Sequence, residues 1–161
     1  MDKPPTEPTV RALRPDDLER VIAIDRAVTG STRRRFMEKR LAVSQLHPED
    51  YLFVGVEQGG TLAGYALGRI LHGEFGLREP VAVLDAMGVD PASQDHGYGH
   101  ALAAGVIKVV RRKGVHRLHS QAEWTSHALL RFFDSTGFRL APRVVLERGT
   151  AQAMVEAPEE I

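Results

Sequence analysis

The sequence has no cysteine, few aromatic residues and no excess of charge of either sign. Without cysteine among its 161 residues, the chain can form neither disulfides nor thiolate metal sites, and it has no cysteine nucleophile. The 21 Lys and Arg residues balance 21 Asp and Glu residues, so no overall field attracts nucleic acid or an anionic membrane. Any anion-binding site must therefore be local.

Long apolar runs are also missing. No stretch approaches the roughly 18 apolar residues of a membrane span, and the polar, proline-rich residues 1–8 (MDKPPTEP) lack the apolar core of a secretory signal. We therefore expect a cytoplasmic protein with neither membrane nor nucleic acid as a partner. The length predicts one domain over residues 9–150, between a tail of residues 1–8 and a C-terminal tail of residues 151–161.

Hydrophobic periodicity predicts a mixture of strands and helices. The apolar spacing of Leu18, Val21, Ile22 and Val28 is that of a helix, and Gly30 can end it. Gly59 and Gly60 separate two runs that read as a hairpin. The predicted strands are residues 9–13, 51–57, 61–71, 81–89, 116–122 and 143–148, and the predicted helices begin near Asp16, Ser31 or Thr32, Tyr98, and Thr125 or Ser126.

The most informative stretch runs from Val81 to Lys113. It reads as a buried strand, a loop that carries Gln94, Gly97 and Gly99, and a helix that begins on the glycines. A helix N-terminus presents unpaired N–H groups and the positive end of the helix dipole, and glycine lets a phosphate come close to both. The pattern therefore predicts a pyrophosphate site at this loop.

At these residues the sequence resembles a known family. The loop Gln94-Asp95-His96-Gly97-Tyr98-Gly99 resembles the acyl-CoA signature of the GNAT superfamily of N-acetyltransferases. The strand end Met87-Gly88-Val89-Asp90-Pro91 and the block from Trp124 to Phe138 are similar to two further family segments. The resemblance implies an α/β (α+β) fold with a mixed, mostly antiparallel twisted sheet of about six or seven strands, about four helices and splayed central strands.

The resemblance also implies a reaction and a cofactor. An acetyl group would pass from acetyl-CoA to a primary amine, in a small molecule or a peptide, by direct attack in a ternary complex and without a metal. The resemblance also leaves homodimerisation open as a possibility, because dimers are frequent among similar folds. The implied cofactor-binding residues are Met87, Gly88, Val89, Gln94, Asp95, His96, Gly97, Tyr98, Gly99, His100, Ser126 and Phe133.

Asp85 is the candidate catalytic base, because family members often place an acidic residue at this point of the central strand. An alkyl amine with a pKa near 10 is mostly protonated at neutral pH and must lose a proton before attack. Strand alternation places Asp85 on the same face as Met87 and Val89 unless a bulge intervenes. A purely structural carboxylate, satisfied by a neighbouring strand or an arginine, is the alternative, and Glu123 or a water could be the base instead.

Two residues depart from the family pattern. Phe133 stands where many relatives have a tyrosine that protonates the CoA sulfur, and Ser126 stands where an asparagine usually caps the helix. Ser135, a water or helix-end N–H groups could replace the missing acid, or the thiolate could leave unprotonated. The departures also leave open an acyl-CoA-binding sensor or interaction module with little catalysis, and a site for a different nucleotide phosphate is a third alternative.

The run Arg33-Arg34-Arg35 is the densest cluster of positive charge. Its simplest interpretation is a solvated helix face. Under the resemblance, one of these arginines would instead face the acceptor site, and the acceptor would then carry a carboxylate or a phosphate, which arginine binds through two parallel hydrogen bonds.

Overall fold

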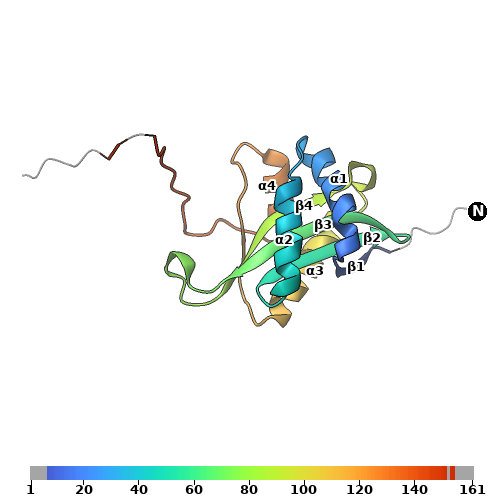
Figure 1. Cartoon of the computed structure of the whole chain (residues 1–161), viewed down its shortest axis with the longest axis horizontal. Coiled ribbons are helices and arrows are strands. Elements are labelled where there is room, and N and C mark those ends of the chain that lie inside the picture. Colours follow the sequence, from blue (N-terminus) through green and yellow to red (C-terminus); the bar gives the residue numbers. More distant parts are fainter. Residues whose placement is uncertain (1–6, 152, 155–161) are drawn as a thin grey trace, which may run out of the picture.

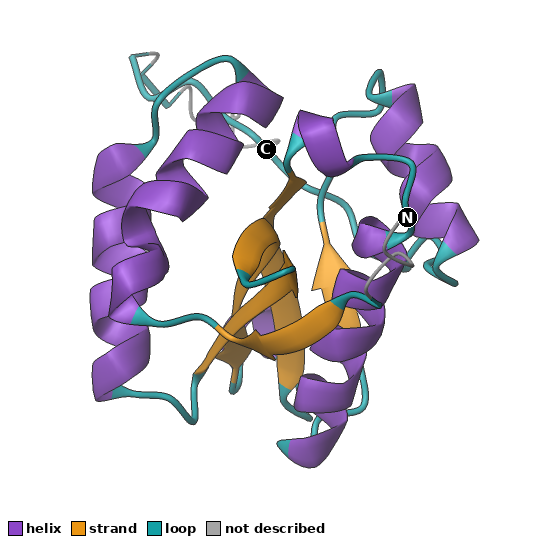
Figure 2. Ribbon diagram, turned by 90° about the vertical axis from the view of Figure 1, so that its right-hand side faces the viewer, coloured by secondary structure: helices purple, strands orange, loops and turns teal. Residues whose placement is uncertain are grey.

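The computed structural model describes residues 7–151 and 153–154, and it places a five-stranded sheet between two groups of helices (Figures 1 and 2). Predictions that fall on residues 1–6, 152 and 155–161 lie outside this range, including most of both predicted tails. The strands are β1 (Thr9–Ala12), β2 (Tyr51–Gln58), β3 (Thr61–Leu71), β4 (Val81–Val89) and β5 (Leu118–Ser120). The helices are α1 (Leu18–Thr29), α2 (Arg34–Leu46), α3 (Tyr98–Arg112) and α4 (His127–Ser135).

The strands follow one another across the sheet in chain order, β1-β2-β3-β4-β5. The first three pairings are antiparallel, and only β4 and β5 run parallel. The parallel pair needs a crossover, which α3 supplies. The predicted fold class and its mostly antiparallel sheet are confirmed, although the described residues contain five strands and not six or seven.

Local sequence explains most element boundaries. Gly59 and Gly60 adopt φ of 56° and 82°, which closes the predicted β2–β3 hairpin. Gly30 adopts the left-handed conformation at the end of α1, as its position predicts. These glycines hold backbone conformations that other residues adopt at a cost.

Each face of the sheet carries its own apolar cluster. On one face, Leu102, Val106 and Val110 of α3 pack on inward-facing residues of β2, β3 and β4, and Phe133 of α4 joins them. On the other face, Val21, Ile22 and Ile24 of α1 and Met37 and Leu41 of α2 pack on Tyr65, Leu67 and Ala86. The sheet is thus the middle layer of three, and β4 lies between both clusters.

The C-terminal part of the prediction is wrong in two respects. The strand predicted over residues 116–122 is only three residues long, and residues 143–148 form no strand. Leu140, Val144 and Leu146 are 99%, 81% and 88% exposed, and Figure 1 shows this segment running away from the sheet. A strand requires a partner edge, and β5 is too short to provide much of one.

Within the described ranges, no helix has the length and apolar character needed to cross a membrane.

Candidate functional site

The site begins where β4 loses one of its neighbours. Parallel pairing between β4 and β5 ends at Leu84 and Ser120, where the Ser120 hydroxyl donates a hydrogen bond of 3.1 Å to the Leu84 carbonyl. β4 then continues to Val89, paired only with β3. Within the described chain, the edge of β4 from Asp85 to Val89 therefore has no strand beside it, which is the predicted splay. Such an edge can bind an extended ligand through its backbone groups.

A bulge lies at the first residue past this break. Leu67 pairs with Ala86 but Gly68 pairs with Leu84, so Asp85 is the extra residue in β4. Gly68 permits this arrangement, because a Cβ there would lie 2.3 Å from the Val83 carbonyl oxygen. Any side chain at Gly68 would thus collide with the backbone of β4.

The bulge reverses the predicted direction of Asp85. Its side chain contacts Arg40 of α2, on the face that also buries Ala86, whereas Met87 and Val89 pack on the α3 face. Regular alternation would have placed Asp85 with Met87 and Val89, and the bulge is the exception that the sequence analysis allowed for. Gly88 pairs regularly with Tyr65, so the ladder is undisturbed there. Gly88 leaves room for the Tyr65 ring, which would lie 3.1 Å from a Cβ at this position.

Two arginines surround Asp85. The Arg40 Nη2 atom lies 3.0 Å from Asp85 Oδ2, and the Arg69 Nε atom lies 3.7 Å from Oδ1. The Asp85 side chain is 14% exposed, and Oδ2 is buried without a well-directed hydrogen bond from any described residue. The carboxylate is thus ion-paired with two arginines, which is the arrangement expected of a structural carboxylate. Glu123, the alternative base, is exposed three residues beyond the end of β5.

The exit of β4 is fixed by hydrogen bonds. Asp90 caps the short turn Pro91–Ser93 by accepting a hydrogen bond of 3.0 Å from the Ala92 N–H, and Arg20 of α1 pairs with the same carboxylate. The Ala92 N–H and the Arg20 guanidinium hold the pKa of Asp90 below its ordinary value. Gln94 donates from Nε2 to the Val89 carbonyl at 3.2 Å, which ties the following loop to the strand end.

The predicted phosphate loop leads directly into the N-terminus of α3. Gly97 is the N-cap of this helix with φ of 81°, and a Cβ placed there would meet nothing within 4 Å. Gln94, Asp95, His96 and His100 are exposed around it, and the His96 Nδ1–H donates to the Gln94 carbonyl at 2.6 Å. Tyr98 differs, because its side chain is buried in the core and only its backbone N–H remains at the helix end. The open surface at Gly97 suits the close approach of an anion.

Gly99 has a different role from Gly97. A Cβ at Gly99 would lie 3.0 Å from Cε2 of Phe132, so this glycine lets the start of α3 approach α4. His100 completes the contact, with its ring edge-on to Phe132 at 5.6 Å and its Nε2 atom 3.1 Å from the Ser135 hydroxyl. The Ser135 hydroxyl donates to the Phe132 carbonyl at 2.7 Å, so its proton is already engaged.

The two departures from the family pattern lie on α4. Ser126 occupies the N-cap position, as predicted, but its side chain makes no capping hydrogen bond. Phe133 is 8% exposed and packs against Phe132 and Phe138, with ring centroids 5.8 and 4.8 Å apart. The structure therefore places Phe133 in the core.

A buried polar group that the sequence analysis missed lies between α1, α2 and β3. Asp25 is 1% exposed and accepts hydrogen bonds from the Tyr65 hydroxyl at 2.6 Å and from Arg33 Nε at 3.0 Å. Burial raises the pKa of Asp25, but the bonds from Arg33 and Tyr65 outweigh burial and hold it below its ordinary value. The missed signal was the position of Asp25 three residues after Ile22, within the apolar stripe of α1.

The triple-arginine cluster is mostly engaged elsewhere. Arg33 pairs with Asp25, and Arg34 pairs with Glu19 and Glu38 on the surface. The guanidinium groups that reach Asp85 are Arg40 and Arg69, which the sequence analysis did not select.

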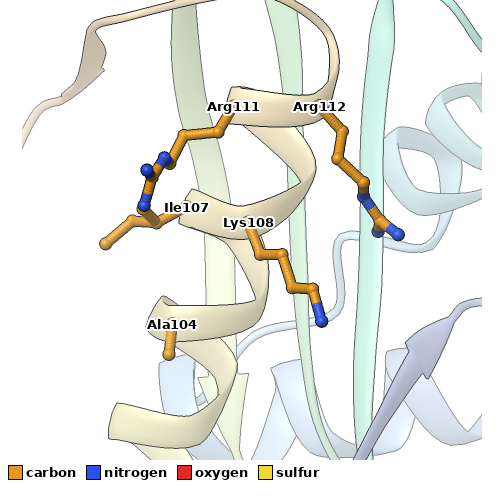
Figure 3. Close-up of a pocket in the computed structure, with 5 residues that line it drawn as sticks. All are labelled: Ala104, Ile107, Lys108, Arg111 and Arg112. Atoms are coloured by element: carbon orange, nitrogen blue, oxygen red, sulfur yellow. The ribbon is translucent and has the colours of Figure 1, made fainter.

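A second basic region lies on the outer side of α3. Ala104, Ile107, Lys108, Arg111 and Arg112 line an open hollow of about 500 Å³, with Arg111 directed to one side of the helix and Lys108 and Arg112 to the other (Figure 3). Arg111 and Arg112 are in the last turn, where they complement the helix dipole. This turn is at the opposite end of the helix from Gly97. Among the described residues, no three His, Asp or Glu side chains gather in a way that could hold a metal ion.

Comparison with known proteins agrees with this geometry. A mycothiol acetyltransferase of Propionibacterium freudenreichii is 27% identical over 131 residues, which cover 78% of this chain but only 41% of the relative. A putative acetyltransferase of Salmonella typhimurium, solved with its cofactor acetyl-CoA, superposes with a TM-score of 0.70 at 24% identity, covering 84% of this chain and 82% of that one. An aminoglycoside acetyltransferase from a soil metagenome, solved with sisomicin, gives 0.69 at 19% identity, covering 89% and 95%.

The chain thus spans less than half the length of the curated relative, and the likeness to the two solved structures concerns the fold. Residues 18–138 match the model of the acetyltransferase (GNAT) family. That match includes the unpaired edge of β4, the Gly97 loop and α4, and it covers well over half of the sequence. The chain therefore belongs to the acetyltransferase (GNAT) family of acyltransferase enzymes.

Proposed function

We propose that this GNAT-family acyltransferase transfers an acetyl group from acetyl-CoA to a primary amine by direct attack in a ternary complex. The observation that carries the proposal is the continuity between the unpaired edge of β4 and the open N-terminus of α3. The family's acetyl-CoA-bound Salmonella neighbour supports the choice of cofactor.

The cofactor has two places to bind on this framework. The backbone of Met87, Gly88 and Val89 follows the edge of β4 that no described strand pairs with, and the amides of the pantetheine arm can pair with such an edge as an added strand would. The pyrophosphate then meets the first N–H groups of α3 at Gly97, where the helix dipole and the missing side chain both favour an anion. Gln94 steadies the loop between these two parts.

The acceptor amine must lose a proton before it attacks the thioester. Asp85 lies at the break between β4 and β5, with a buried oxygen that accepts no well-directed hydrogen bond within the described chain. It can take the proton directly or through a water, with Glu123 or a water alone as the alternative. The departing thiolate finds no acid at Phe133, whose ring is in the core, and the Ser135 proton is engaged with a backbone carbonyl. Helix-end N–H groups can stabilise the thiolate without protonating it.

A second candidate function is an acyl-CoA sensor with little catalysis. It is favoured by the ion pairs that Asp85 makes with Arg40 and Arg69 and by the core position of Phe133. Release of free thiol from acetyl-CoA, measured with a panel of amines, separates the candidates. Steady thiol release that falls at least 100-fold in Asp85→Asn supports catalysis. Binding of acetyl-CoA without thiol release in the presence of any tested amine supports the sensor.

The first experiment tests the cofactor by calorimetric titration with acetyl-CoA. Gly97→Trp places a large side chain at the N-terminus of α3, and Gly114→Trp is the matched control at the other end of the same helix. Both glycines have positive φ, 81° and 73°, and a Cβ added at either would meet no atom within 4 Å, so both substitutions carry the same backbone strain. We expect micromolar binding in the wild type and in Gly114→Trp, and at least a tenfold loss in Gly97→Trp. Equal loss in both variants, or none in either, would contradict the proposal.

A further inference from the structure

A pocket beside Asp85 indicates what the acceptor must carry. Phe36, Lys39, Arg40 and Val43 of α2 and Tyr51 of β2 line a hollow of about 310 Å³. Arg40 is both a wall of this pocket and the partner of Asp85, so the pocket adjoins the point where β4 and β5 separate. In the sheet, Tyr51 of β2 lies opposite Arg69 of β3, and Arg69 lies opposite Val83 of β4. Arg69 is therefore between the pocket and the point where β4 and β5 separate.

The charges around the pocket do not balance. Lys39, Arg40 and Arg69 are three cations, and among the described residues Asp85 is the only carboxylate that forms an ion pair with Arg40 or Arg69. The acidic residues next to them in sequence are engaged elsewhere, since Glu38 pairs with Arg34 and Asp50 with His72. The local excess of positive charge is notable in a chain whose total charge is zero.

Arg40 is held in a fixed orientation. Its side chain is 17% exposed, and its guanidinium carbon lies 5.3 Å from the centre of the Phe36 ring and 5.5 Å from that of Tyr51. Contacts of this kind stabilise a cation while leaving the edges of the planar group available for hydrogen bonds. The Arg40 Nη2 atom lies 3.0 Å from Asp85 Oδ2, and in the described chain no hydrogen bond is formed by the Nε or Nη1 atoms.

We propose that the acceptor amine carries a carboxylate or phosphate group, which Lys39, Arg40 and Arg69 bind while the amine points to Asp85. The proposal rests on the acetyltransferase function proposed above. An anion would compensate the excess positive charge, and planar guanidinium groups bind carboxylate and phosphate through two hydrogen bonds. The Asp85 carboxylate, whose side chain is 14% exposed, would accept a hydrogen bond from the amine nitrogen.

The same charge arrangement disfavours polycationic acceptors. Aminoglycosides carry several ammonium groups, and here they would meet three cationic side chains and one carboxylate. The chain shares its fold with the aminoglycoside acetyltransferase solved with sisomicin, but this pocket favours acceptors of the opposite charge.

Matched pairs of amines test the proposal. L-alanine is compared with L-alaninamide, and glucosamine 6-phosphate with glucosamine, so each pair differs in the anionic group, and sisomicin serves as the polycation. Binding of each amine to CoA-saturated and cofactor-free protein is measured by calorimetry, and acetylation by thiol release. We expect the anionic member of at least one pair to bind at least tenfold more tightly than its neutral partner, and sisomicin not to bind. The preferred pair identifies the anion as carboxylate or phosphate.

Charge-removing variants test the assigned residues. Lys39→Met should weaken binding of the preferred anionic amine at least fivefold, and it should leave the affinities for the neutral partner and for acetyl-CoA unchanged. Lys108→Met, which removes an exposed lysine from the outer hollow on α3, is the control and should change none of these affinities.

The outcomes separate the two proposals. Equal binding of anionic and neutral partners in both pairs, or tighter binding of sisomicin, would overturn the anionic acceptor even if acetylation occurs. If acetyl-CoA does not bind, the proposed acetyl transfer is contradicted. Even then, the anion-binding role of the pocket would be supported if an anionic amine binds more tightly than its neutral partner and this preference is lost in Lys39→Met.

Discussion

The buried carboxylate of Asp25 allows a sharp test of the packing between α1, α2 and β3. Tyr65→Phe removes the hydroxyl that donates to Asp25 Oδ1 at 2.6 Å and leaves a ring of the same shape in a fully buried position. Arg33 still donates to both carboxylate oxygens, so neither oxygen loses all of its partners. The loss is therefore that of one hydrogen bond to a charged group.

Such a bond contributes about 2 kcal/mol to the free energy of unfolding, within a range of about 1.5–3. For a chain of this size, each kcal/mol changes Tm by about 2–4 °C, so Tyr65→Phe should lower Tm by about 4–8 °C. The acid-dependent part of the stability should also become smaller. One of the two groups that lower the pKa of Asp25 would be absent, so the folded pKa moves back toward the unfolded value and Asp25 contributes less to the loss of stability in acid.

Urea denaturation measures the free energy of unfolding, and scanning calorimetry at several pH values measures Tm. Tyr51→Phe is the control, because the Tyr51 hydroxyl makes no hydrogen bond in the described chain while its ring packs on Arg40. The control should stay within about 0.5 kcal/mol of the wild type. A Tyr65→Phe protein with wild-type stability and an unchanged acid transition would refute the assignment of this hydrogen bond.

Two further predictions concern acid stability and the bulge. Arg11 lowers the pKa of Asp17, and Arg33 and Tyr65 outweigh burial to lower the pKa of Asp25. At pH values between the folded and unfolded pKa values, the unfolded chain therefore binds more protons than the folded chain. Their stabilisation should be complete above about pH 5 and should fall as the pH drops below about 4, as measured by urea denaturation across pH. Gly68→Ala should destabilise the chain by about 1–3 kcal/mol because its Cβ would lie 2.3 Å from a carbonyl oxygen. Gly73→Ala, with open space around it, should have little effect, and equal Tm values for both variants would contradict the role of Gly68.

Sequence alone predicted the elements whose causes are local. The hairpin of β2 and β3 follows from Gly59 and Gly60 between two apolar runs, and the order of β4, loop and α3 follows from the glycines at 97 and 99. The position of the loop from Gln94 to Gly99, between β4 and α3, was predictable for the same reason. Gly97 and Gly99 nevertheless turned out to have different surroundings, open space and the Phe132 ring, which no sequence pattern distinguishes.

The errors arose where the cause lies elsewhere in the chain. The direction of Asp85 depends on Gly68, which is on the neighbouring strand, and the partners of Asp25 are 8 and 40 residues away. Residues 143–148 have the composition of a strand, but composition does not supply a neighbouring edge. The arginines that reach the site were missed because density of charge in the sequence drew attention to Arg33, Arg34 and Arg35.

The bulge at Asp85 also limits what an alignment can transfer to this chain. Two relatives can align across β4 without a gap while one has the extra residue in its ladder and the other does not. Their residues at position 85 would then point to opposite faces of the sheet, although the aligned letters are the same. Positions 68 and 85 must therefore be compared together. A glycine at position 68 permits the bulge, and the bulge decides which face of the sheet residue 85 points to.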